Sequence, residues 1–219
     1  MIVEPKMQNA YRVLARVTSV MDGFVTDSQF VDLLRVTQLA LDQAEVDPSR
    51  IPAFHDRILA EFPSGNGVLN RELSRIIGYL KDARVASEIQ GYLAESTDSD
   101  LDKLQVILNL GTIADEFTDD QRIAVISFIE KMKTNEEVSE SNYSLYLTSI
   151  LGTWSDEVSD TQVSEILKNG AKWPSAALSA FYKLPEQLTE QQIEWITHCL
   201  LYTSPSPRDL STSRMPSSA

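Results

Sequence analysis

Cysteine and histidine are scarce in this sequence of 219 residues. It contains one cysteine, Cys199, and two histidines, His55 and His198. One cysteine excludes an internal disulfide, and because Cys199 falls in an atypical terminal segment, the rest of the chain also lacks a thiolate metal ligand and a cysteine nucleophile. The histidines are far apart and no order of Ser and Asp around them suggests a catalytic triad. We therefore expect both to lie on helix surfaces.

Positive charge and long apolar runs are also limited. Lys and Arg number 19 against 32 Asp and Glu, which gives a formal net charge of -13. Phosphate contacts require a basic face, so a nucleic-acid partner is disfavoured, and the acidic balance is more typical of solubility than of recognition. No run of 18 or more apolar residues is present, and the start Met1–Lys6 lacks a signal-peptide core. We expect no membrane insertion.

Catalytic constellations are absent as well. The sequence has no set of metal ligands at a recognised spacing, no nucleophile beside a base and no cofactor-binding loop. We therefore expect no catalytic, metal or cofactor-binding residues, no small-molecule ligand, and a protein as the partner.

The segment 199–219 differs from everything before it. It is rich in Ser and Pro and lacks the apolar residues needed to order a backbone, so its composition predicts disorder. Cys199–Asp209 also resembles, codon for codon, the translation of a transposase-type sequencing-library adapter, and Ser213–Ala219 resembles the fixed primer that follows the variable index. We therefore expect the natural chain to stop near His198, with 199–219 a non-native tail. A genuine Ser/Pro-rich tail is the alternative.

A short phrase recurs along the rest of the chain. Each copy has Thr or Ser three residues before Gln, with an acidic residue between them. The copies are Thr26–Gln29, Thr118–Gln121, Ser159–Gln162 and Thr189–Gln192. Such a hydroxyl accepts hydrogen bonds from first-turn amides, the Gln side chain reaches back to the N-cap amide, and the acid suits the positive end of the helix dipole. Each copy therefore predicts a helix start with a capping box.

Two copies belong to a longer repeat. Leu110–Glu116 aligns with Leu151–Glu157 at an offset of 41 residues. Helix pairs that recur every 30 to 45 residues or so are typical of α-solenoids, in which each pair buries its apolar face only by stacking on its neighbours. Strand signals are nearly absent. The pattern predicts an all-α solenoid of antiparallel, right-handed helix pairs over residues 8–198, within one domain at 1–198.

Apolar spacing places the individual helices. The predicted helices are at residues 8–21, 27–44, 52–61, 68–80, 83–94, 100–114, 119–132, 143–154, 160–169, 174–183 and 190–198. The apolar residues at helical spacing are Phe30, Leu33, Leu34 and Val36–Leu41 in one helix and Leu69, Leu73, Ile76, Ile77 and Leu80 in another.

One part of the chain carries a family resemblance. Its residues are Phe62-Pro63, a Gly/Asn-rich turn, Leu69-Asn70-Arg71-Glu72-Leu73 with Ile76, Tyr79 and Leu80, the helix Leu104–Leu110 and the helix start Asn142-Tyr143. From Phe62 to about Ile150 the sequence resembles the HEAT-like helical region of large secreted bacterial multidomain proteins. In those proteins a propeller-type dehydrogenase-like module and HEAT-like repeats precede a c-type cytochrome domain.

The resemblance implies a function without chemistry of its own. It implies a non-catalytic scaffold or interaction segment, periplasmic or secreted, within a larger redox protein. Because the chain is expected to stop near His198 before an adapter-like tail, we also expect a fragment of metagenomic source. The chain has no Cys-x-x-Cys-His, so the haem attachment of such proteins would lie elsewhere. The alternative is a free-standing HEAT-like protein-binding module with no link to redox chemistry.

Some residues invite sharper hypotheses. Asp98–Asp102 imitates the first half of an EF-hand loop, but Lys103 stands where the loop needs Gly and Asn109 where it needs Glu, so we expect Asp98 or Asp100 to cap a helix. Gly65-Asn66-Gly67 could cradle an anion before a helix, but a plain turn is favoured.

Two further groups have a structural and a functional interpretation. Glu72 beside Arg71 and Arg75 could be a buried carboxylate site, but pairing between successive helices is favoured. The tryptophans are expected to fill the core between repeats. They are Trp154, Trp173 and Trp195.

Overall fold

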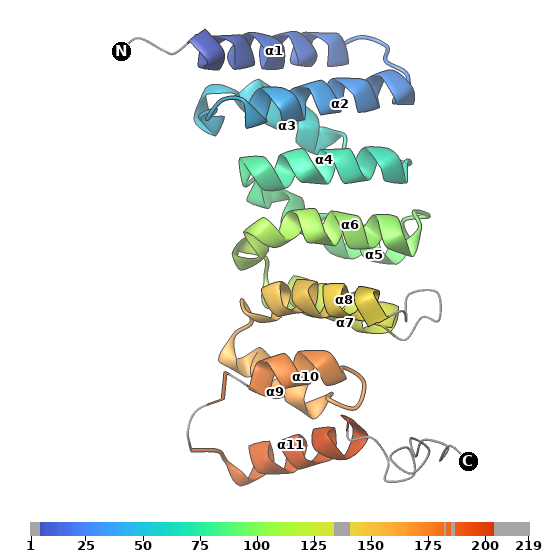
Figure 1. Ribbon diagram of the computed structural model, residues 1–219, viewed down its shortest axis with the longest axis vertical. Coiled ribbons are helices and arrows are strands. Elements are labelled where there is room, and N and C mark those ends of the chain that lie inside the picture. The colour runs from blue at the N-terminus through green and yellow to red at the C-terminus, as the bar shows by residue number, and fades with distance from the viewer. Residues whose placement is uncertain (1–4, 134–140, 182, 185–186, 204–219) are drawn as a thin grey trace, which may run out of the picture. The chain divides into compact units, whose positions relative to one another are not determined.

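The protein is all-helical in the part that the structure describes. The computed structural model describes residues 5–133, 141–181, 183–184 and 187–203, and these contain helices and no β-strand (Figure 1). The α-helices are α1 (Pro5–Met21), α2 (Asp27–Asp42), α3 (Pro52–Ala60), α4 (Gly67–Leu80), α5 (Ile89–Glu95), α6 (Asp100–Leu110), α7 (Asp119–Lys133), α8 (Ser141–Ser155), α9 (Asp160–Lys168), α10 (Pro174–Phe181) and α11 (Glu190–Thr203). The prediction of an all-α fold is confirmed. No helix among the described residues combines the length and apolarity that a bilayer crossing needs.

The described residues also form short 3-10 helices, η1 (Pro48–Arg50), η2 (Ala83–Ser87) and η3 (Gly111–Glu116). η2 and η3 each replace part of a predicted helix. The stretch predicted at 83–94 is η2 followed by α5, because the Asp82 carboxylate accepts from the Arg84 amide and closes a tight first turn. The stretch predicted at 100–114 changes from α6 to η3, where Ile113 leaves helical backbone angles.

The chain folds into two compact units, residues 1–125 and 126–219. In the first unit α2 packs against α1 and α4, α4 packs against α3 and α6, and α1 packs against α3. Figure 1 shows α2, α4 and α6 side by side in one row, with α3 and α5 behind it.

Hydrogen bonds fix the register of this row. Asn66 at the start of α4 donates to Asp27 at the start of α2, and Tyr79 at the end of α4 donates to the Leu41 carbonyl at the end of α2. The two helices therefore run in the same direction. α4 and α6 are joined in turn by Asn109, which donates to the Arg71 carbonyl.

α4 lies at the centre of the first unit, and its apolar residues at helical spacing form a buried stripe. The buried residues of this stripe are Leu69, Leu73, Ile76, Ile77 and Leu80. Burying each such side chain contributes about 1.5–3 kcal/mol. Of the apolar residues of α2, Phe30, Leu34 and Leu41 are buried, whereas Val36 and Leu39 are exposed.

Two glycines allow α4 to approach α6 closely. A Cβ on Gly78 would lie 2.4 Å from the Asn109 carbonyl oxygen, and a Cβ on Gly67 would lie 2.8 Å from Oδ2 of Asp102. Neither position has room for a side chain, because backbone and a held carboxylate occupy the space.

Three of the four predicted capping boxes form. In each, the Thr hydroxyl accepts from the Gln amide and the Gln side-chain oxygen accepts from the Thr amide. They are Thr26–Gln29, Thr118–Gln121 and Thr189–Gln192. The fourth copy starts a helix as predicted, with Ser159 at the N-cap of α9, but the predicted capping box is wrong because the Ser159 side chain makes no cap hydrogen bond. Gln162 is buried in the second unit instead of reaching back to the cap.

The second unit is built from α8–α11 and the C-terminal part of α7. α10 packs against α8, α9 and α11, and Trp154 on α8 is fully buried. α11 continues through Thr203, so residues 199–203 of the segment expected to be disordered are helical. Residues 204–219 lie outside the described residues, and the non-native origin of 199–219 stays a prediction.

Candidate functional site

The acidic stretch that imitates a calcium loop is used for helix capping and packing. Ser99, and not Asp98 or Asp100 as predicted, is the N-cap of α6, because its hydroxyl accepts from the Asp102 amide at 3.1 Å. Asp98 instead accepts from Asn70 Nδ2 at 2.7 Å and from the Tyr92 hydroxyl at 2.9 Å. The chain is helical from Asp100 onward, so these carboxylates do not wrap around one point. Among the described residues, no group of three or more His, Cys, Asp or Glu could hold a metal ion.

His55 belongs to a partly buried charge cluster and not to an open helix surface as expected. Its Nδ1 lies 3.3 Å from Oδ2 of Asp82, whose side chain is 7% exposed. Arg84 binds the same carboxylate through Nε at 2.9 Å and Nη2 at 2.7 Å, and it pairs with Asp56 at 2.6 Å. Burial alone would raise the pKa of Asp82, but the hydrogen bonds from Arg84 lower it below the ordinary value. His198 is exposed on α11, in the other unit.

Glu72 links α4 to α2. Gln38 Nε2 donates to its Oε2 at 2.7 Å, Arg75 Nη1 donates to the same oxygen at 2.9 Å, and Arg35 Nε lies 3.5 Å from Oε1. Arg71 pairs with Asp102 of α6 at 3.1 Å. The interpretation of these charges as pairing between successive helices agrees with the geometry.

The Gly65-Asn66-Gly67 turn has no open anion cradle. Asn66 is the N-cap of α4 and its side-chain oxygen accepts from the Val68 amide at 3.0 Å. The Asp102 carboxylate lies against Gly67, where it would repel an anion. Of the three tryptophans, only Trp154 fills a core; Trp173 and Trp195 are partly exposed.

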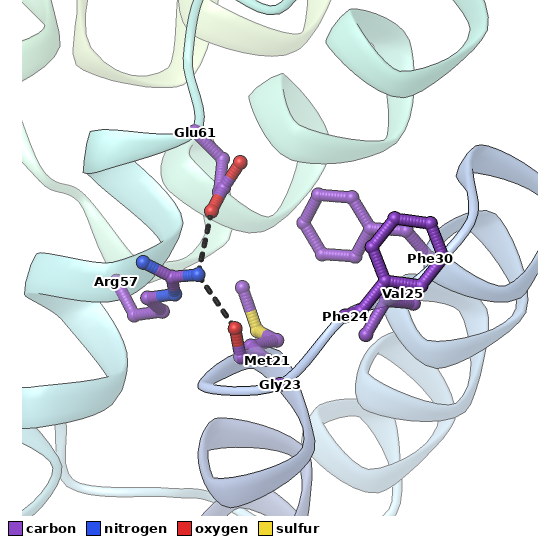
Figure 2. A pocket seen from close by; sticks show the side chains of 7 residues that line it. All are labelled: Met21, Gly23, Phe24, Val25, Phe30, Arg57 and Glu61. Carbon is purple, nitrogen blue, oxygen red and sulfur yellow. Dashed lines mark hydrogen bonds and ion pairs between the residues drawn. The ribbon is translucent and has the colours of Figure 1, made fainter.

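One feature of the first unit has no packing role. Phe24 lies in the turn between α1 and α2 and is 95% exposed, the most exposed large apolar side chain among the described residues. Figure 2 shows it with Val25 and Phe30 on one side of a pocket, while Arg57 of α3 and Glu61, the residue that follows α3, face it from the other side. This phenylalanine was not among the residues expected to matter. The available signal was an aromatic residue in a short polar turn between two strongly predicted helices.

The backbone on both sides of Phe24 is held in place. Arg57 Nη2 donates to the Met21 carbonyl at the end of α1 at 2.6 Å, and the same nitrogen pairs with Glu61 at 3.1 Å (Figure 2). After the turn, the capping box of Thr26 fixes the start of α2. Phe24 is therefore presented from a defined turn and not from a long loop.

Two pockets share Phe24 and Val25, one with a mixed polar and apolar lining and one with a mainly apolar lining. The first is lined in addition by Met21, Gly23, Phe30, Arg57 and Glu61. The second lies between α1 and α2 and is lined in addition by Val20, Gln29, Asp32, Leu33 and Val36. We call these two pockets with Phe24 the Phe24 site.

A second exposed surface lies on the row of helices. Apart from Phe24, the large apolar side chains exposed in the described part of the first unit are on α2, α4 and α6: Val36, Leu39, Val68, Tyr79 and Leu101. The partly exposed guanidinium groups of Arg35, Arg71 and Arg75 lie among these helices, each beside a carboxylate. We call this surface the arginine face.

The charged residues that the sequence pointed to are engaged in contacts between helices, as Glu72, Asp98 and Asp82 show. Comparisons with protein-family models, curated proteins and solved structures found no match.

Proposed function

We propose that the chain is a non-catalytic helical-repeat scaffold that holds or binds other proteins. The supporting observation is a spacing that recurs among the polar contacts between elements of the first unit. Several of them join residues 34 to 38 positions apart, as in Gln38–Glu72, Tyr79–Leu41, Arg57–Met21, Asn109–Arg71 and Gln121–Ala86. Others, such as Asn70–Asp98, join residues 28 positions apart. The recurring spacing lies within the range of repeat units that stack into α-solenoids, and it is shorter than the roughly 40 to 47 residues of a typical HEAT repeat.

The proposed architecture is a HEAT-like α-solenoid of antiparallel pairs. In such a stack each helix touches only its neighbours, and repeated polar contacts fix the register that apolar packing alone leaves free. The shared direction of α2 and α4 supports it, since every second helix of a stack of pairs points the same way.

We further propose that this scaffold belongs to a larger secreted bacterial redox protein. The support is the resemblance of residues 62–150 to the helical region that precedes a c-type cytochrome domain. The test is the sequence of the gene around this segment. A downstream Cys-x-x-Cys-His and an upstream signal peptide with propeller repeats are the expected findings. A helical frame that ends soon after His198 would contradict the redox context and leave a free-standing protein-binding module.

Independent sequencing reads test the terminal segment. We expect reads that cross His198 to continue into other coding sequence. Cloned genomic DNA that encodes Cys199–Ala219 would contradict the adapter interpretation.

A further inference from the structure

The Phe24 site combines an exposed aromatic ring with two pockets that share it, one mainly apolar and one partly polar. A single exposed apolar side chain is common on protein surfaces and indicates nothing. Here the ring has apolar neighbours in the turn and at the helix ends beside it. They are Val20, Val25 and Leu33, which line the pockets together with Phe24. A contiguous apolar surface of this kind is typical of a binding site.

The site is ordered before any partner arrives. The Arg57 bond to the Met21 carbonyl and the capping box at Thr26 hold the turn at both ends. Binding therefore needs little ordering of this backbone, which removes one of the main costs of association.

The charges around the site select the partner. Asp22 and Asp27 flank Phe24 in sequence, and Asp32 and Glu61 line the two pockets. Arg57 is the one cation in the two pocket linings, and it is already paired with Glu61. Asp32 has no ion pair among the described residues. The whole chain, at -13, adds a long-range field of the same sign.

We propose that the Phe24 site docks a basic, apolar segment of another protein. Apolar side chains of that segment fill the two pockets, and a Lys or Arg lies over the Phe24 ring and close to Asp32. A cation over an aromatic face is favourable, and nearby carboxylates strengthen the attraction. A second copy of this chain fits poorly, because two surfaces of net negative charge would repel each other. The inference rests on the proposed role as a protein-binding scaffold.

The test measures binding of labelled amphipathic peptides to the full chain by fluorescence anisotropy at physiological ionic strength. One peptide carries Leu on one helix face and Lys on the other, and its counterpart carries Glu in place of Lys. We expect the Leu/Lys peptide to bind and the Leu/Glu peptide not to bind. Phe24→Ala should weaken binding by at least about tenfold, as loss of a central aromatic anchor does. Asp32→Asn should weaken it by about twofold to fivefold, with a shallower salt dependence.

Leu39→Ala is the matched control, because Leu39 is an exposed apolar residue of α2 that lies outside the two pockets. It should leave binding unchanged, and thermal unfolding should show that Phe24→Ala and Leu39→Ala are equally well folded. Equal affinity of Phe24→Ala and the unchanged chain overturns the proposal. Tighter binding of the Leu/Glu peptide overturns it as well and points to the arginine face. A Phe24-dependent dimer in analytical ultracentrifugation would identify a second copy as the occupant and overturn it too.

Failure of this inference is separable from failure of the proposed function. The chain could bind neither peptide and still open repeat by repeat, as expected of stacked repeats. That result would contradict only the docking site and would leave the scaffold proposal standing.

Discussion

Glu130 is a buried carboxylate that caps a helix distant from it in sequence. It is 4% exposed on α7, and its Oε1 accepts from the Ala176 amide at 2.7 Å. α10 starts at Pro174 after a tryptophan, so the residue before the helix has no hydroxyl or carboxylate with which to cap its first turn. The negative charge of Glu130 satisfies that turn and faces the positive end of the helix dipole.

Glu130 should make stability depend on pH with a definite sign. Burial raises its pKa above the ordinary 4.5, only partly offset by the Ala176 amide and the charge of Lys133. Between pH 4.5 and the raised pKa of the folded state, the folded chain therefore binds more protons than the unfolded chain. The free energy of unfolding falls as pH rises through this range. Glu130→Gln keeps an acceptor and removes the charge. In urea unfolding at a series of pH values from acid to neutral, the stability of the unchanged chain relative to Glu130→Gln should decline as pH rises.

A second variant separates the cap from the charge. Glu130→Ala removes the acceptor and should cost about 0.5–2 kcal/mol, as loss of a helix cap does. If the Gln and Ala variants lose equal stability at every pH, the capping role is wrong.

The stability that Asp82 contributes should depend on pH with the opposite sign. Although burial opposes it, the Arg84 hydrogen bonds lower the pKa of Asp82 below 3.8, so this carboxylate stabilises the fold above that pH and loses its contribution as pH falls through its folded value. Asp82→Asn should cost about 1–3 kcal/mol at neutral pH. The loss should shrink as the same urea series reaches acid pH. Asp56→Asn is the control, because its exposed pairing with Arg84 should be worth less than about 1 kcal/mol. A pH-independent loss in Asp82→Asn would contradict the assignment.

At the scale of the element, the same sequence phrase has two different roles. Gln121 caps α7 through the Thr118 amide and also donates to the Ala86 carbonyl at 2.7 Å, so it joins two successive segments of the first unit. Gln162 occupies the matching position in α9 but is buried, and its Oε1 has no hydrogen-bond partner among the described residues. The phrase predicts where a helix begins, and tertiary burial decides what its Gln does.

A pair of substitutions measures this difference. Gln121→Met removes two hydrogen bonds and should cost about 1–3 kcal/mol. Gln162→Met replaces a buried polar group that lacks one partner and should be neutral or slightly stabilising. Denaturant unfolding of the full chain compares them. Equal losses would show that Gln162 is satisfied in solution and that its burial is not the reason for the missing cap.

Helix positions could be predicted from sequence because their causes are local. The capping boxes of Thr26, Thr118 and Thr189 and the period of the apolar residues fix where helices begin, whatever packs against them. The 3-10 segments could not be predicted, since η3 makes a contact 34 residues away, from the Thr112 hydroxyl to the Gly78 carbonyl. The exposure of Leu39 likewise depends on which side of α2 its neighbours cover.

The candidate site was less predictable than the helices. Polarity indicated that Glu72 would pair between helices, but the sequence did not identify Gln38 and Arg35 of α2 as its partners. Phe24 is apolar, and apolar residues near a capping box are normally expected to pack on the first turn. Its exposure follows from the short turn that Arg57 holds, which only the folded arrangement brings to the end of α1.

At the scale of the whole molecule, the question is how far along the chain one core substitution lowers stability. Leu73 is fully buried on α4, which packs against α2, α3 and α6. Leu73→Ala should cost about 2–5 kcal/mol by opening a cavity. In a stack of repeats each repeat contacts only its neighbours, so the loss of stability should be confined to the repeats next to Leu73.

Hydrogen exchange read by mass spectrometry distinguishes these cases. With Leu73→Ala, peptides from α2, α4 and α6 should exchange faster, while those from α9 and α10 in the second unit should keep their protection. Trp154→Phe provides the reverse variant, since Trp154 is buried in the second unit, and it should speed exchange in α9 and α10 more than in α2 and α4. If either substitution speeds exchange uniformly from α1 to α11, the chain unfolds as one cooperative core. The solenoid proposal would then be wrong, even though the described part of the chain is all-helical.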